Sequence, residues 1–145
     1  MPAVSPRLRR LLVVCLALFA VLAINGVYLA AVTIAEWSSG ATIQNFFYQY
    51  MFLAHLVLGL AITAPVVVFG VLHVRNAHGR KNRLAVRVGY ALFATSLVLL
   101  ASGFVLTRLE GLIEVKDPGV RAAAYWTHVL SPLLVVWLFV LHRLA

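Results

Sequence analysis

Four of the five histidines lie within long apolar stretches and form two pairs along the chain: His55 with His73, and His128 with His142. An ionisable side chain in such a stretch costs free energy unless it has a partner, so it is functional by default when the stretch crosses a membrane. A neutral imidazole is also the side chain that most often binds a metal ion. The two pairs are therefore predicted metal ligands.

The spacing of these histidines places them at two levels. An α-helix turns 100° per residue, so His55 and His73, 18 residues apart, project from one face. His128 and His142 are 14 residues apart and differ in direction by about 40°. If both helices run the same way, His55 lies level with His128 at the outer side, and His73 with His142 at the inner side. Two imidazoles at each level predict bis-histidine ligation of two b-type haems.

The composition indicates a membrane protein, because 63% of the 145 residues are hydrophobic and 11% are charged. A membrane-spanning helix needs about 20 apolar residues. Four stretches are long enough, at about 11–35, 46–74, 84–107 and 122–143. Short connections separate them. The sequence therefore predicts an all-α protein, an integral membrane four-helix up-down bundle, with residues 1–145 as a single transmembrane domain.

Basic residues determine the expected orientation in the membrane. Nine of the twelve Lys and Arg residues fall on one side of the predicted bundle, at the N-terminus, between residues 75 and 87, and at Arg143. All four acidic residues fall on the other side. Cytoplasmic loops carry the excess of positive charge, so we expect both termini in the cytoplasm, with the inner membrane of a bacterium as the location. The net charge of +8 is then explained by the orientation of the chain in the lipid bilayer, with most of its basic residues on the cytoplasmic side. No nucleic-acid partner is expected.

The first stretch also has features of a secretory signal, since three arginines precede it. A signal core has about 7 to 15 apolar residues, whereas this stretch continues for 25 residues. A retained helix is the preferred interpretation. The single cysteine, Cys15, excludes a disulfide within the chain and covalent attachment of a c-type haem.

Glycines occur where flat cofactors would need room. Gly89 and Gly103 in the third stretch are 14 residues apart, which equals the separation of His128 and His142. Further candidates lie near the ligands in the second stretch, Gly59 and Gly70, and in the first, Gly26. A helix beside a porphyrin edge benefits from a missing side chain. Small residues also simply allow helices to approach closely, so both interpretations remain open.

Other polar and aromatic residues are candidates for secondary roles. Haem propionates need cationic partners, which we expect from Arg83 and Arg87 at the inner side and from Arg108 and Arg121 at the outer side. The same arginines could instead anchor helix ends in lipid headgroups. A quinone could stack on Trp37, Tyr125 and Trp126, which are otherwise interfacial anchors. His78 is expected in a solvated loop, and residues 116–119 are expected to form a turn.

The pattern of His55, His73, His128 and His142 with Gly89 and Gly103 resembles the four-helix di-haem core of b-type membrane cytochromes. It is similar to the N-terminal half of cytochrome b and to the di-haem cytochrome b subunits of nitrate reductase, formate dehydrogenase and hydrogenase complexes. That resemblance implies that the four histidines bind two haems and that the paired glycines flank the rings. Two departures are apparent. First, His55 and His73 are 18 residues apart, whereas the two ligands on this helix of cytochrome b are about 14 apart, which is an axial difference of about 6 Å. Second, the Pro-Glu-Trp-Tyr signature of the quinol site is absent.

We therefore expect a b-type cytochrome that carries electrons across the membrane as a subunit of a respiratory or photosynthetic redox complex. An electron-transfer subunit is favoured over a stand-alone enzyme, with partner subunits and a quinone as candidate redox partners. Pro65 and Pro132, between the paired ligands, could absorb the spacing mismatch by kinking the helices. The alternatives are a histidine-based protein that binds or transports metal ions, and a haem-free membrane anchor subunit.

Overall fold

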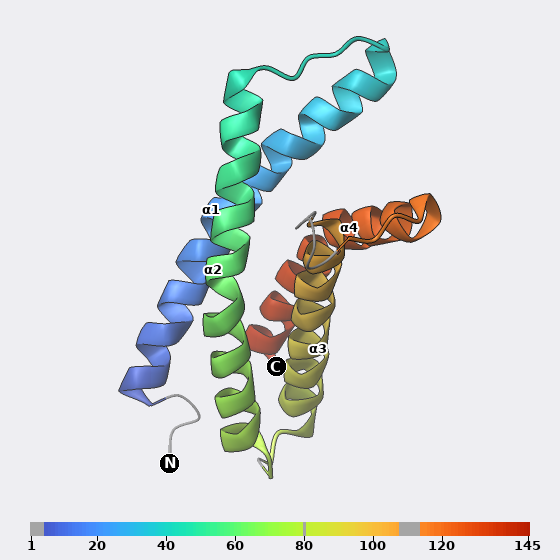
Figure 1. The fold of residues 1–145 in the computed structure, drawn as a ribbon. Coiled ribbons are helices and arrows are strands. Elements are labelled where there is room, and N and C mark those ends of the chain that lie inside the picture. Colours follow the sequence, from blue (N-terminus) through green and yellow to red (C-terminus); the bar gives the residue numbers. More distant parts are fainter. Residues whose placement is uncertain (1–4, 80, 108–113) are drawn as a thin grey trace.

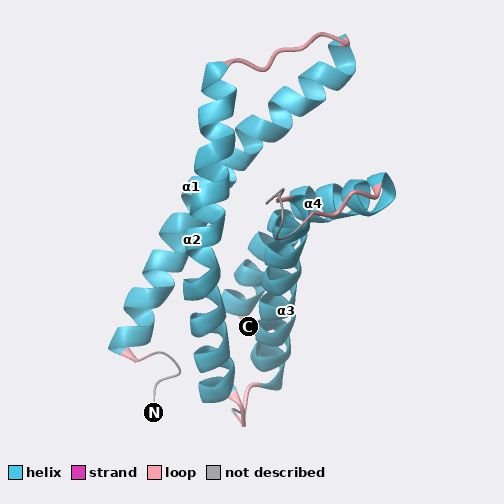
Figure 2. Ribbon diagram, viewed as in Figure 1, coloured by secondary structure: helices cyan, strands magenta, loops and turns pink. Residues whose placement is uncertain are grey.

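The computed structural model describes residues 5–79, 81–107 and 114–145. These residues form four helices and no strand (Figures 1 and 2). The helices are α1 (Pro6–Ser39), α2 (Phe46–Ala77), α3 (Arg83–Leu106) and α4 (Pro118–Leu144). The all-α, four-helix prediction is confirmed.

Each helix begins at a residue whose side chain satisfies a free backbone N–H in the first turn. Ser5, Asn45, Asn82 and Asp117 accept hydrogen bonds from the backbone three residues later. Polar side chains of this kind are the preferred N-caps. α1 ends at Gly40, whose φ of 68° is the left-handed conformation that favours glycine. The starts of the four helices and the end of α1 are thus encoded locally by the sequence.

All four helices are long and apolar enough to cross a membrane. The predicted spans lie almost entirely within the helices, and the helices extend further at several ends. One local prediction is wrong: Pro118 and Gly119 begin α4 and do not complete a turn. Proline is well suited to the first helical position because it has no N–H to satisfy there. Asp117 completes this start by accepting a hydrogen bond from Val120 N at 2.8 Å.

The helices associate as two hairpins. α1 packs mainly against α2, and α3 packs mainly against α4. Figure 1 shows α1 and α3 running in one direction and α2 and α4 in the other, with the start of α1 and the end of α4 toward the lower part of the view. The α1–α2 connection is held by Glu36, whose carboxylate accepts hydrogen bonds from Ile43 N at 2.9 Å and from the side chain of Gln44 at 2.9 Å.

α4 changes direction along its length. In Figure 1 its first part (orange) runs at a steep angle to its last part (red). Pro132 lies inside this helix, and a proline removes the hydrogen bond to the carbonyl four residues earlier, here that of His128. A sharp bend in a helix is usually caused by such a residue. α2 also contains a proline, Pro65.

Few side chains are buried within the described part of the chain. The buried hydrophobic residues are Leu8, Cys15, Ile62 and Leu138. The buried polar residues are Asn25, Ser102 and Ser131. A buried polar group is costly unless it is hydrogen-bonded, and two of these three, Asn25 and Ser102, bond to histidines.

Candidate functional site

The structure brings the four histidines together as two pairs between the hairpins. The rings of His55 and His128 have centres 6.0 Å apart and planes at 82°. The rings of His73 and His142 have centres 5.9 Å apart and planes at 87°. Each pair joins α2 to α4, although no Cα atom of α2 comes within 8 Å of one in α4 among the described residues. The two backbones are therefore far apart at these levels, and the histidine side chains extend into the space between them.

The separation of the rings fits two ligands of one metal ion. A metal ion lies about 2.0 Å from an imidazole nitrogen, which lies about 1.1 Å from the ring centre, so two imidazoles on opposite sides of one ion have centres about 6 Å apart. Both observed distances agree with this value to within a few tenths of an ångström. The difference between 18-residue and 14-residue spacing does not keep the second pair apart.

Carbonyl oxygens of α3 fix the proton position on the two α4 histidines by accepting hydrogen bonds from them. Nδ1 of His128 lies 3.1 Å from the carbonyl oxygen of Leu99. Nδ1 of His142 lies 3.0 Å from the carbonyl oxygen of Ala85. A carbonyl oxygen only accepts, so in both rings Nδ1 carries the proton and donates. Nε2 then keeps its lone pair and can bind a metal ion, which is how metal-ligating histidines are usually oriented.

Two polar side chains complete the surroundings of the His55/His128 pair. Asn25 Oδ1 lies 3.1 Å from Nδ1 of His55. Ser102 Oγ lies 3.3 Å from Nδ1 of His128 and donates to the carbonyl oxygen of Leu99 at 2.9 Å. The sequence patterns did not single out Ser102, and they did not predict that Asn25 contacts a histidine. A polar residue level with a predicted ligand in an apolar helix was the signal that could have found both.

The His73/His142 pair has a different environment. The ring of His73 stacks on that of Phe69, one turn earlier in α2, with centres 5.3 Å apart and planes at 9°. The ring of His142 is held by the backbone of α3 at Ala85. An aromatic ring parallel to an imidazole restricts its rotation by packing. Both pairs are thus oriented, one by polar side chains and the other partly by stacking.

Gly89 and Gly103 lie directly against the α4 histidines. A Cβ on Gly103 would come 2.9 Å from Cε1 of His128, and a Cβ on Gly89 would come 3.1 Å from Cε1 of His142. Each glycine follows by four residues the carbonyl that accepts from the same ring, Leu99 or Ala85. The missing side chains therefore let each imidazole lie on the helix and reach its carbonyl. Whether the same glycines also flank a porphyrin stays a prediction.

The remaining predicted glycines have different neighbours. A Cβ on Gly26 would lie 3.4 Å from Cε1 of His55, so this position also faces a predicted ligand. A Cβ on Gly70 would collide with the ring of Phe93, which already fills that space. Close packing of α2 against α3 thus accounts for Gly70. A Cβ on Gly59 would meet nothing within 4 Å.

Three of the four arginines predicted to bind haem propionates lie within the described residues. Arg83 and Arg87 are exposed at the start of α3. Nη1 of Arg121, in the first turn of α4, is buried without a hydrogen-bond partner. Arg108 lies outside the described residues. The aromatic candidates do gather: Trp37 lies 6.1 Å from Tyr125 and 5.8 Å from Trp126, centre to centre.

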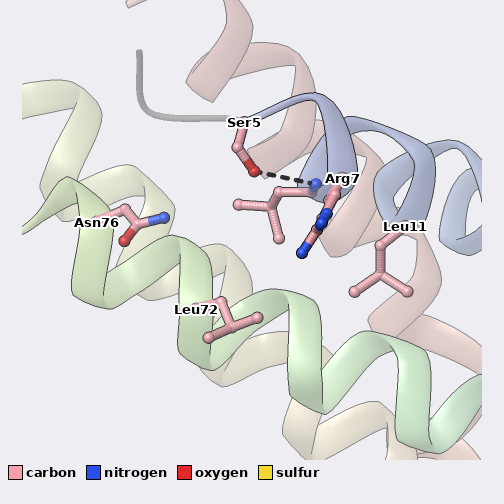
Figure 3. A pocket seen from close by; sticks show the side chains of 6 residues that line it. Ser5, Arg7, Leu11, Leu72 and Asn76 are labelled. Atoms are coloured by element: carbon pink, nitrogen blue, oxygen red, sulfur yellow. Dashed lines mark hydrogen bonds between the residues drawn. The ribbon is translucent and has the colours of Figure 1, made fainter. Parts of the chain in front are cut away.

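His78 and the pocket shown in Figure 3 both lie away from the paired rings. His78 caps α2, is exposed, and its Nδ1 lies 3.1 Å from the hydroxyl of Tyr90. The pocket is formed by the start of α1 and the end of α2 (Figure 3), and its lining residues are Ser5, Arg7, Leu8, Leu11, Leu72 and Asn76. Neither contributes to the histidine pairs.

The fold and the site define a helical protein with four potential membrane spans and two oriented histidine pairs between its hairpins. Within the described ranges, no three His, Cys, Asp or Glu residues cluster as they would around an ion held by protein ligands alone. Comparison with protein families, with curated proteins and with solved structures finds no match to this chain.

Proposed function

We propose that this protein is a b-type cytochrome that carries electrons across a membrane through two bis-histidine haems. The observation that carries the proposal is the pair of imidazole–imidazole separations, 6.0 and 5.9 Å, at two levels of one bundle. Each level offers two imidazoles, and among the described residues no third His, Cys, Asp or Glu joins either pair. Such a donor set suits a porphyrin, which supplies the four remaining nitrogens itself.

His55 and His128 hold the first haem in this proposal, and His73 and His142 hold the second. A haem held by these histidines would supply one-electron transfer, and the two imidazoles would leave no place at the metal for oxygen or substrate. The chain contributes ligand orientation, burial and local charge, which together set the potentials. Gly26, Gly89 and Gly103 keep space beside the rings, and Arg83, Arg87, Arg108 and Arg121 are candidates for the propionates.

The protein works in an up-down bundle with both termini in the cytoplasm, so that electrons move between an outer and an inner haem. It functions as a subunit of a larger redox complex, with quinone as a candidate partner near Trp37, Tyr125 and Trp126. Those three rings come together from the end of α1 and the start of α4. Any reaction on a substrate is carried out by the other subunits of that complex.

The decisive experiment uses the full chain, purified in detergent after expression with haem available. A pyridine haemochrome assay should give two haems b per chain, and dithionite should produce a b-type α-band. Replacing His55 or His142 by alanine should each remove one haem. His78→Ala is the matched control and should retain both, since this exposed side chain lies in neither pair.

Three other outcomes would overturn the proposal. Stoichiometric zinc or copper without porphyrin would indicate a histidine-based metal-ion protein. A chain that binds neither haem nor metal would be a membrane anchor. Haem that survives replacement of all four paired histidines would be bound at the wrong place for electron transfer through this bundle.

A further inference from the structure

Asn25 is the one buried polar side chain of α1, within the described residues, that reaches a histidine of another helix. Its exposed fraction is 8%. Its amide nitrogen donates to the carbonyl oxygen of Met51 at 3.0 Å, and Met51 Sδ lies 3.4 Å from the same nitrogen. Its amide oxygen lies 3.1 Å from Nδ1 of His55. Asn25 therefore joins α1 to α2 at two points, one turn apart on α2.

The bond to Met51 decides which atom faces His55. If the amide were turned over, its oxygen would lie against the carbonyl oxygen of Met51, and two acceptors would oppose each other. With the nitrogen on Met51, only the oxygen of Asn25 can face the ring. An amide oxygen cannot donate, so Nδ1 of His55 must carry the proton. Nε2 of His55 is left with its lone pair and without the proton.

We infer that Asn25 is a positioning residue that sets the orientation and electronic character of His55 as a ligand, and so lowers the potential of the haem at this pair. The inference rests on the proposed function. An imidazole that donates from Nδ1 becomes a more basic ligand at Nε2. A more basic ligand stabilises ferric iron over ferrous iron. The group that does this comes from α1, whose residues supply none of the predicted ligands.

The two histidine pairs differ in this respect. The acceptors for His128 and His142 are backbone carbonyls of α3, which no substitution of a side chain removes. The acceptor for His55 is the side chain of Asn25, so it can be removed or exchanged without changing a ligand. The ring of His73 lies stacked on that of Phe69, and Asn25 contacts His55 of the other pair. The effect of Asn25 should therefore be confined to the His55/His128 haem.

The test is a redox titration of the purified protein in a His142→Ala background, in which only the His55/His128 haem is expected. Asn25→Leu has similar volume and no acceptor, so it should raise the potential and weaken haem binding about 10- to 100-fold. Asn25→Asp retains an acceptor oxygen whether or not the carboxyl is ionised. It should leave the potential at the parent value or below it. A purely structural role would shift both variants in the same direction.

Thr33→Val is the matched control, because Thr33 also has a polar side chain on α1, two turns later, and its partners, the carbonyl of Leu29 at 3.0 Å and the side chain of Tyr48, are not predicted ligands. It should leave the potential unchanged. With all ligands present, Asn25→Leu should alter one of two haems. Equal shifts of both haems, loss of both, or an unchanged potential in Asn25→Leu would overturn the role of Asn25. Absence of haem from the parent protein would instead overturn the proposed function.

Discussion

Gly103 lies so close to His128 that a single added carbon on the glycine would come 2.9 Å from Cε1 of the imidazole. The same ring donates to the carbonyl of Leu99, four residues before the glycine. Gly89, His142 and Ala85 repeat this arrangement 14 residues away. α3 thus has two similar contact sites for the two histidines of α4, and each site consists of a carbonyl acceptor and a glycine. The equal spacing of glycines and histidines has this direct structural cause.

Alanine at these glycines should disturb the pairs in the order of the contacts. Gly103→Ala should weaken haem binding at His55/His128 most, by about 10-fold or more, because the ring must leave its carbonyl. Gly89→Ala should have a smaller effect on the other haem, since its Cβ would lie 3.1 Å from His142. The measurement is haem content per chain, followed during competition with an apo-haem acceptor.

Gly59→Ala is the matched control for these two variants. A Cβ there meets nothing within 4 Å, and alanine is favoured over glycine inside a helix by about 0.5–1 kcal/mol. Haem content should therefore be unchanged and the melting temperature should not fall. If Gly59→Ala lost as much haem as Gly103→Ala, the contact with His128 would not be the reason for the glycine.

The perpendicular imidazole planes should be visible in the electron paramagnetic resonance spectrum. In the proposed cytochrome each imidazole would interact with one of the two iron dπ orbitals, and ring planes at 82° and 87° would engage both orbitals almost equally. The two orbitals are then nearly degenerate, and the low-spin ferric signal is strongly anisotropic. Parallel planes would split them and give a rhombic spectrum. A rhombic signal from both haems would contradict the ring orientations described above.

Helical periodicity was sufficient to predict much of this arrangement. The number and type of elements follow from four long apolar stretches, and the pairing of His55 with His128 and of His73 with His142 follows from 100° per residue. These features depend on patterns along single helices. Bilayer thickness and helix geometry constrain them strongly, so no knowledge of side-chain contacts is needed.

Contacts between helices were less accessible from the sequence. Asn25 contacts His55 because α1 crosses α2 near these two residues. No pattern within α1 predicts where the two helices cross. Gly70 had the same sequence context as a cofactor-facing glycine, yet Phe93 of α3 fills its space. Pro118 and Gly119 were expected in a turn because their composition favours one, whereas the capping side chain of Asp117 starts a helix there.

Gly70 should matter for stability of the bundle and not for ligation. Any larger side chain must displace the ring of Phe93, and overpacking of this kind costs about 1–3 kcal/mol. Gly70→Ala should therefore lower the melting temperature in detergent while both haems still bind in the folded protein. Phe93→Leu should recover part of the loss in the double variant, because contacting residues are energetically coupled. Additive effects of the two substitutions would contradict this contact.

The orientation of the chain can be tested at two exposed lysines on opposite ends of the bundle. Lys81 lies in the connection before α3, and Lys116 lies before α4 with 79% of its side chain exposed. In a Cys15→Ala background, Lys116→Cys should react with a membrane-impermeant maleimide added to intact cells. Lys81→Cys should react only after the membrane is opened, since the basic connection is expected in the cytoplasm. Labelling of both from outside would contradict four spans, and the reverse pattern would place the His55/His128 pair at the cytoplasmic side.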